Sequence, residues 1–273
     1  MDRGYYGIMQ TPSLTTAGVM RPFFGRLYWI HIGFGIPWIV FGIQHYIYAD
    51  FVSGLVPAYL PWRLFWAYFT GTAMLAAGVS FLIRRQVQLA AFLLGCLMLI
   101  YLLLVHPPML WNEPQVGQHW TRFMQDIAIM ASAFALAILY GKGASGGWRA
   151  WLASPAAGRA VRYCYALPFV VLGAQHFTHN VFVAGKIPTW IPLAGFWDYP
   201  VGLLLIAAAY GILFTSHARR IAVAWGIMLT VLALLQHLPL LIANPYNPVE
   251  WTNGMLDIAL AAGACIISTV VDR

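Results

Sequence analysis

Long apolar segments alternate with short polar ones along the whole chain of 273 residues. A helix needs about 20 mostly apolar residues to cross a bilayer core of about 30 Å. Segments that meet or approach this length are 27–46, 64–83, 87–105, 124–140, 161–177, 196–214, 221–241 and 255–271. We therefore predict an all-α polytopic membrane protein with eight transmembrane helices.

The composition agrees with this prediction. Hydrophobic residues make up 61% of the chain and charged residues only 8%, whereas a soluble domain carries about 25% charged residues. So little charge would not cover the surface of a soluble globule. The aromatic share of 15%, with 12 Trp, is typical of proteins whose amphipathic rings lie at the membrane–water interfaces.

The sequence repeats itself once, at a fixed offset of 131 residues, which indicates a tandem duplication. Four helices per copy return the chain to its starting side, so the copies should be parallel repeats related by an axis along the membrane normal. The glycine-rich stretch 141–147 is the natural boundary between them. We predict one four-helix unit over residues 1–145 and a second over residues 146–273.

The Lys and Arg residues predict the orientation of the chain. On one side of the predicted membrane lie Arg63, Arg122 and Lys186; the other side has positions 3, 21, 26, 84, 85, 142, 149, 159, 162, 219, 220 and 273. By the positive-inside rule, both termini lie in the cytoplasm and the chain in the inner (cytoplasmic) membrane. The net charge of +7 is thus explained by the topology. Alternatively, the basic side is a surface that binds anionic lipid or a soluble partner. We expect no nucleic-acid partner.

Polar residues that occur in both copies fall near the outer ends of the predicted helices. Ionisable groups within a membrane span usually face the bundle interior or a wet cavity, which makes them functional candidates. Imidazole can transfer a proton near neutral pH, ligate a metal or bind a quinone carbonyl. The candidate site consists of Gln44, His45, His106 and Asp126 in the first copy, and Gln175, His176, His237 and Asp257 in the second. We expect each set to converge at one level of its own four-helix unit.

Other interpretations of these residues stay open. As structural clamps, the Asp and His side chains would lock helices together through hydrogen bonds. As haem ligands, His45 would pair with His106, and His176 with His237. A metal site has no local signature here, because the two His and one carboxylate of each copy come from three different helices. The three cysteines form no CxxC pair, so we interpret them as inert thiols.

A proline-containing segment follows the first helix of each copy, at 56–61 and 187–192. Two prolines four residues apart prevent a helix from continuing. We expect an outer-side loop over the mouth of the bundle, or a tight turn.

Besides this segment, the first copy contains the stretch 42–45, Phe51, Gly71 and the pair Arg84–Arg85. This set of residues resembles the motifs of the DoxX-like/DoxD family. The second copy matches at 173–177, 182, 187–192, 202 and 219–220. The resemblance implies a four-helix membrane unit, here present twice. It also implies a membrane subunit of a quinone-linked oxidoreductase, such as thiosulfate:quinone oxidoreductase, or a protein that works with a thiol-redox partner. His45 and His176 are the first residues carried over from the family's motif.

We therefore expect a membrane subunit of a quinone-linked respiratory or redox complex. It would anchor other subunits of the complex among membrane lipids, and it would bind quinone or relay protons at the outer-side cluster. Quinone is the expected cofactor and haem the alternative. A purely structural anchor and a small-molecule or lipid transporter are the alternative functions, and the sequence leaves open whether the chain is itself an enzyme.

Overall fold

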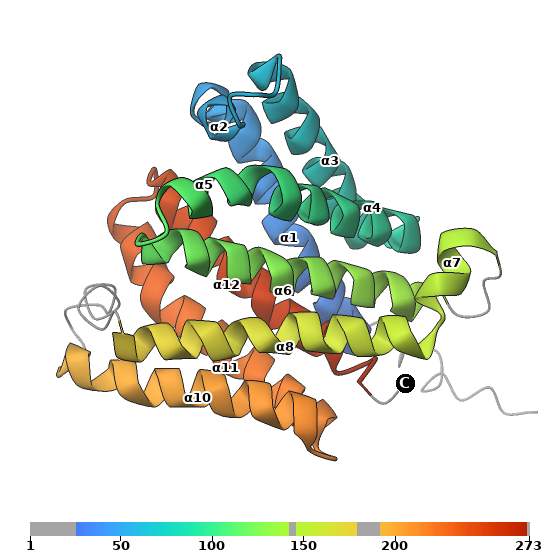
Figure 1. The fold of residues 1–273 in the computed structure, drawn as a ribbon, viewed down its shortest axis with the longest axis vertical. Helices are drawn as coiled ribbons and strands as arrows, with labels where there is room; N and C mark the ends of the chain where they lie inside the picture. The colour runs from blue at the N-terminus through green and yellow to red at the C-terminus, as the bar shows by residue number, and fades with distance from the viewer. Residues whose placement is uncertain (1–25, 142–145, 179–191, 272–273) are drawn as a thin grey trace, which may run out of the picture.

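The computed structural model describes residues 26–141, 146–178 and 192–271, without the side chains of residues 26–28 and 194. All secondary structure in these ranges is helical (Figure 1), which confirms the predicted all-α class for this part of the chain. The helices are α1 (Arg26–Ile47), α2 (Ala49–Leu55), α3 (Arg63–Ile83), α4 (Val87–Ile100), α5 (His106–Asn112), α6 (Gly117–Tyr140), α7 (Gly147–Leu152), α8 (Pro155–Thr178), α10 (Ala194–Phe214), α11 (Ala218–Ala243) and α12 (Pro248–Ile267).

Six of the described helical segments are long and apolar enough to cross a membrane by length and composition. They are α1, α3, α4 with its continuation through α5, α6, α10 and α11. α8 and α12 are of similar length, but α8 carries Arg159 and Arg162 in its first half and α12 carries Glu250 and Asp257. These charges lower the hydropathy of both helices. The fold is that of a helical membrane protein, and eight spans remain a prediction.

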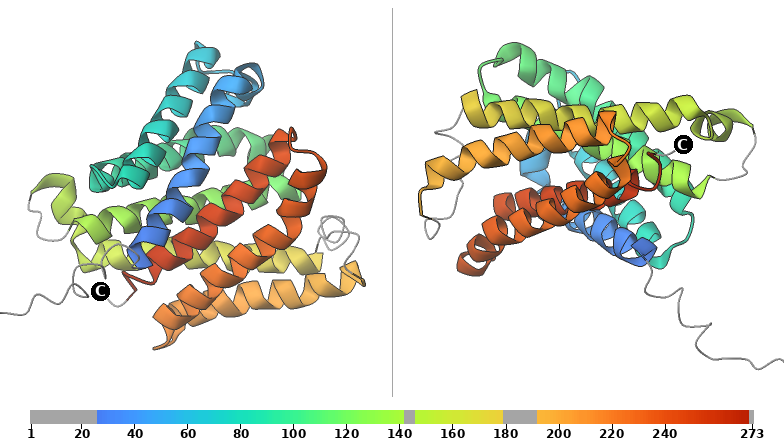
Figure 2. Two further views of the ribbon diagram at one scale, coloured as in Figure 1. Left: turned by 180° about the vertical axis from the view of Figure 1, so that it is seen from behind. Right: turned by 90° about the horizontal axis from the view of Figure 1, so that it is seen from below.

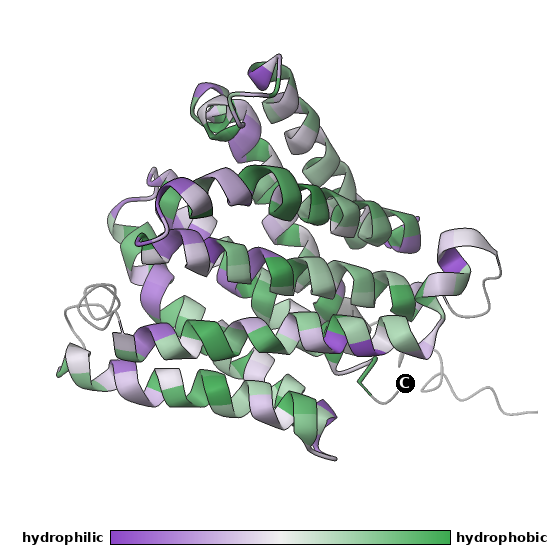
Figure 3. Cartoon of the chain, viewed as in Figure 1, coloured by the Kyte–Doolittle hydropathy of each residue, from purple (hydrophilic) through white to green (hydrophobic). Residues whose placement is uncertain are grey.

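The surface of the molecule is largely apolar, as lipid-facing helices require. Large apolar side chains such as Leu103 and Ile242 are exposed. Hydrophobic residues dominate the middle of α4, whereas hydrophilic residues gather where α5 meets α6 (Figure 3). An apolar surface of this extent on a soluble monomer would mark an aggregation or interaction site.

The helices α1, α6, α8 and α12 form the centre of the molecule (Figure 2). α1 packs against α12, α12 against α6, and α6 against α8. Each of these helices also has an outer neighbour: α3 beside α1, α4 beside α6, α10 beside α8, and α11 beside α12. The first helix of each predicted repeat therefore packs on the last helix of the other repeat.

Two glycine pairs allow α3 to approach α1, and α10 to approach α8, very closely. A Cβ atom on Gly42 would lie 2.8 Å from the Gly71 carbonyl oxygen, and a Cβ atom on Gly71 would lie 2.6 Å from the His45 Cβ. A Cβ atom on Gly173 would likewise lie 2.7 Å from the Gly202 carbonyl oxygen. Small residues permit such close backbone approach between membrane helices. These crossings hold the ends of α1 and α8 that carry the candidate Gln–His pairs.

The variant Gly71→Ala tests the first crossing. We expect it to lower the free energy of unfolding by about 1–3 kcal/mol, because the added methyl group overpacks the contact with His45. Thermal unfolding of the purified protein in detergent, followed by circular dichroism, measures the effect. Gly54→Ala is the matched control, since a Cβ atom there meets nothing within 4 Å. A Gly71→Ala midpoint equal to that of the wild type would contradict the close crossing.

Candidate functional site

The first predicted His–Asp pair forms across the connection from α4 to α6. α4 continues through a π-helical turn, Tyr101–Val105, directly into α5. His106 is 6% exposed, and its Nε2 atom lies 2.7 Å from Asp126 Oδ2 on α6. π-helical turns occur frequently at functional sites. Of the four residues predicted to converge in the first copy, the structure thus brings His106 and Asp126 into contact.

The second His–Asp pair lies at the same end of the molecule, where α11 meets α12 (Figure 1), and has an additional carboxylate. His237 is 4% exposed. Its Nε2 atom lies 3.2 Å from Asp257 Oδ2, and its Nδ1 atom lies 2.9 Å from Glu250 Oε2. An ionised carboxylate only accepts hydrogen bonds, and a neutral imidazole has a single N–H. Two hydrogen bonds therefore need two protons among the three side chains. A neutral imidazole with two ionised carboxylates has only one, so one more proton must be bound to the imidazole or to a carboxylate.

Arg122 joins the two His–Asp pairs. Its guanidinium donates a hydrogen bond to Gln125 Oε1 at 3.2 Å and another to Asn253 Oδ1 on α12. It also interacts electrostatically with both Asp126 and Asp257. Opposite charges attract strongly where water is partly excluded. We call the resulting connected set the polar network; it consists of Glu250, His237, Asp257, Arg122, Asp126 and His106.

Gln44 and Gln175 connect each half of the chain to the other. Gln44 Nε2 donates to the Pro248 carbonyl oxygen at 3.0 Å, and Gln44 Oε1 accepts from Thr252 Oγ1 at 3.2 Å. Gln175 binds the start of α6 in the same way, with Nε2 3.2 Å from the carbonyl oxygen of the first residue and Oε1 2.8 Å from Thr121 Oγ1. Each glutamine thus clamps the end of one helix to the start of another.

His45 and His176 have different partners from the other two histidines. His45 Nδ1 lies 2.8 Å from the carbonyl oxygen of Phe41 on its own helix. His176 Nδ1 lies 3.4 Å from Asp198 Oδ1, and Asp198 is 1% exposed. No hydrogen bond or ion pair among the described residues links these two histidines to the polar network. The prediction that each Gln–His pair joins the His–Asp pair of its own four-helix unit is therefore wrong: Gln44 and Gln175 bind the opposite half, and the two histidines have partners of their own.

The proline-containing segment of the first copy connects α2 to α3, as the sequence predicts for a helix that must end. Arg63 Nε donates to the Val56 carbonyl oxygen at 2.9 Å, and the Tyr59 hydroxyl donates to the Leu104 carbonyl oxygen at 2.6 Å. The segment therefore contacts the π-helical turn that leads to His106. Most of the second segment, residues 187–191, lies outside the described residues.

Sequence reasoning missed three partners of the candidate residues, namely Arg122, Glu250 and Asp198. A signal for Arg122 was present, since it lies four residues before Asp126 and therefore on the same face of a helix. Glu250 and Asp198 carried no such signal, because their counterparts in the first copy are His119 and Ala67. His119 bonds instead to Glu113 at 2.8 Å, near the surface.

The contacts of the histidine ring nitrogens limit which cofactors the polar network can ligate. Both nitrogens of His237 face carboxylates, which leaves neither for a haem iron. Among the described residues, no group of three or more His, Cys, Asp or Glu side chains is arranged to hold a metal ion. The Asp257 side chain is 28% exposed, so the network is accessible at that point to a proton or to a hydrogen-bonding ligand.

No family model matches the chain, and neither a curated protein nor a solved structure is found to match it. The resemblance to the DoxX-like/DoxD family stays a prediction that depends on the residues quoted above.

The variant Arg122→Gln tests the centre of the polar network. We expect it to lower the free energy of unfolding by about 2–3 kcal/mol, because the hydrogen bonds to Gln125 and Asn253 are weakened and Asp126 and Asp257 lose a nearby cation. Arg159→Gln, at an exposed arginine of α8, is the matched control and should stay within about 0.5 kcal/mol of the wild type. Chemical unfolding in detergent measures both variants. The double variant Arg122→Gln/Asp257→Asn should show a coupling of at least about 0.5 kcal/mol, and strictly additive effects would contradict the contact.

Proposed function

We propose that the protein is an integral membrane subunit of a quinone-linked respiratory or redox complex in the inner (cytoplasmic) membrane. In this role it anchors a partner subunit, and the histidines and carboxylates of the polar network pass protons to a quinone headgroup on the outer side. The observation that carries the proposal is the pair of His–carboxylate contacts, one in each half of the chain, with Arg122 near both.

The network contains the groups that a proton relay needs. Imidazole and carboxylate exchange protons near neutral pH, and chains of Asp, Glu and His mark proton paths in membrane proteins. His237 lies between two carboxylates, 2.9 Å from Glu250 and 3.2 Å from Asp257, so its proton can pass to either. Reduction of a quinone to a quinol takes up two protons with two electrons. The network would supply the protons and the partner subunit the electrons.

We infer that α8 and α12 also cross the membrane, which gives eight spans as two parallel four-helix repeats. The His–Asp pairs and the Gln clamps support this inference, because both recur at the offset of 131 residues. Two further contacts join a position to its own counterpart: Arg122 with Asn253, and Ser132 with Gly263. A residue meets its counterpart only near a two-fold axis. That axis would run between α6 and α12.

The end of the molecule with the polar network would face outward. The opposite end carries exposed arginines, including Arg84 and Arg85 after α3 and Arg219 and Arg220 at the start of α11. Basic residues are retained on the cytoplasmic side of the membrane. Both termini would then lie in the cytoplasm.

A purely structural anchor is the second candidate function. The mutual bonding of the network groups favours it, because hydrogen bonds between buried polar side chains also lock membrane helices together. The clamps formed by Gln44 and Gln175 have the same effect.

The variants Glu250→Gln and His237→Asn separate the two functions. The complex is purified through a tag on this chain, and its organic extract and absorption spectrum report quinone and haem. We expect both variants to lower quinone-linked turnover at least about tenfold at normal yield of the complex, because positioned proton-transfer groups contribute about 10²–10⁴-fold. Glu113→Gln, whose side chain is 58% exposed at the same end, is the matched control and should leave turnover unchanged.

Three outcomes decide between the candidates. Lost turnover with intact assembly supports the relay. Lost assembly with normal turnover per assembled complex supports the structural anchor. Normal assembly and normal turnover in both variants and in their combination would remove the network from the mechanism.

Cysteine labelling tests the proposed orientation. Single cysteines at Gln86 and Gln115, both exposed, are introduced into a chain without Cys96, Cys164 and Cys265. A membrane-impermeant maleimide added to intact spheroplasts should label position 115 and not position 86. Labelling of both positions from the outer side would contradict the topology.

A further inference from the structure

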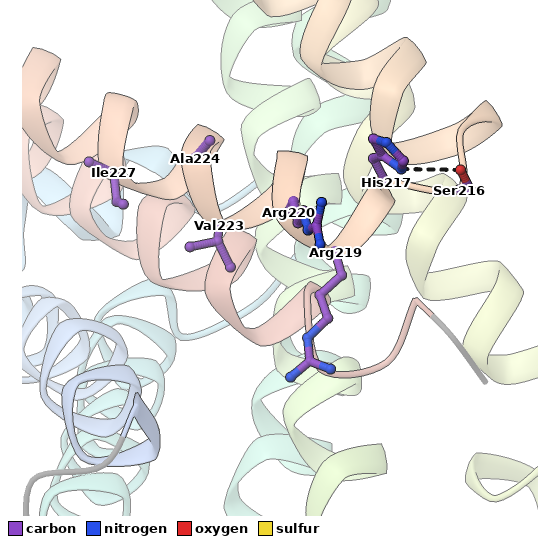
Figure 4. A pocket seen from close by; sticks show the side chains of 7 residues that line it. All are labelled: Ser216, His217, Arg219, Arg220, Val223, Ala224 and Ile227. Atoms are coloured by element: carbon purple, nitrogen blue, oxygen red, sulfur yellow. Dashed lines mark hydrogen bonds between the residues drawn. The ribbon is translucent and has the colours of Figure 1, made fainter.

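An open pocket of ≈ 760 Å³ lies at the start of α11, at the opposite end of this helix from His237 (Figure 4). One end of its described lining is polar and basic. Ser216 and His217 lie in the turn before α11, with Oγ and Nδ1 3.1 Å apart, and Arg219 and Arg220 follow in the first helical turn. All four residues are exposed.

The pocket continues along α11 as an apolar strip. Its lining there consists of Val223, Ala224 and Ile227, and Ile227 is 60% exposed. Figure 4 shows the basic side chains at one end of the row and Ile227 at the other. A helix rises 1.5 Å per residue, so the lining extends for roughly 15 Å along the helix.

This change from basic to apolar matches the chemistry of a phospholipid. The planar guanidinium groups of Arg219 and Arg220 suit phosphate oxygens, which they bind through paired N–H donors. No acidic side chain is part of the described lining, so nothing there competes with an anion. A small anion would leave the apolar strip uncovered, and an apolar molecule would leave the arginines without a counter-charge.

The matching position of the first half lacks these basic groups. At the offset of 131 residues, His217 corresponds to Gln86 and Arg220 to Leu89. A pocket of ≈ 300 Å³ between α3 and α4 includes both of these residues, and its lining is mostly apolar. The first half has its own arginine pair, Arg84 and Arg85, but neither is part of the described lining of its pocket.

We propose that the pocket at the start of α11 binds one anionic phospholipid from the leaflet at the basic end of the molecule. Its phosphate lies on Arg219 and Arg220, and an acyl chain runs along Val223 and Ile227. The site is separate from the polar network and holds whether or not the proposed redox function is correct.

Lipid titration tests the site. The full-length chain, delipidated in a mild detergent, is titrated with phosphatidylglycerol or with zwitterionic phosphatidylcholine, and native mass spectrometry counts the lipid retained. We expect phosphatidylglycerol to bind about thirtyfold more tightly, at about 1 kcal/mol for each arginine. The variant R219Q/R220Q should lose this preference. R84Q/R85Q removes two arginines from the same end but outside the pocket, and it should keep the preference.

A second variant and a competitor complete the test. Ala224→Leu narrows the apolar strip without removing charge, so it should lower phosphatidylglycerol retention severalfold at an unchanged unfolding midpoint; it also decides the question if R219Q/R220Q fails to fold. Displacement of the lipid by millimolar inorganic phosphate would show a free-anion site and overturn the proposal. Equal binding of the two lipids to the wild type, or equal losses in R84Q/R85Q and R219Q/R220Q, would overturn it as well.

Discussion

A charged or polar side chain among membrane helices needs a partner, and the arrangement of this fold depends on that requirement. A lone carboxylate or imidazole at depth costs roughly 2–3 kcal/mol even by insertion measurements. The polar network meets this cost by bringing together groups from α5, α6, α11 and α12. Each half pairs its own histidine with a carboxylate, and Arg122 on α6 interacts electrostatically with Asp126 of its own half and with Asp257 of the other. The contact between α6 and α12 is thus an electrostatic requirement as well as a packing surface.

The two halves have diverged at the positions that carry charge. The second half has Glu250 beside its buried histidine and Asp198 beside His176, where the first half has His119 and Ala67. The backbone contacts and clamps recur in both halves, whereas these ionisable groups do not. Chemistry that depends on them therefore belongs to the second half, and the first half contributes mainly the matching helices and Arg122.

The sequence predicted the helical class, and of the expected convergence of four residues in each copy the structure shows the His–Asp part. These predictions follow from two signals. The hydrophobic pattern indicates where a residue lies along a helix, and the repeat indicates which residues occur in both copies. Neither signal reports which helix a face will meet. The contacts of Gln44 and Gln175 with the opposite half were therefore not predicted. Glu250 and Asp198 were not predicted as partners because neither residue is repeated. For α8 and α12, charged residues reduce the hydropathy on which recognition of a span depends.

The packing of α1 against α12 has a consequence for how the chain is made. A chain is synthesised from its N-terminus, so α1 can pack against α3 early but lacks α12 until this last described helix has emerged. Gln44 meets the carbonyl oxygen of Pro248 across 204 residues of sequence, and until then its amide faces lipid or the translocation machinery. A ribosome that stops before α12 therefore releases a product with an unsatisfied polar group in the membrane. This unpaired amide would be the feature by which proteases that survey newly inserted proteins recognise the truncated chain.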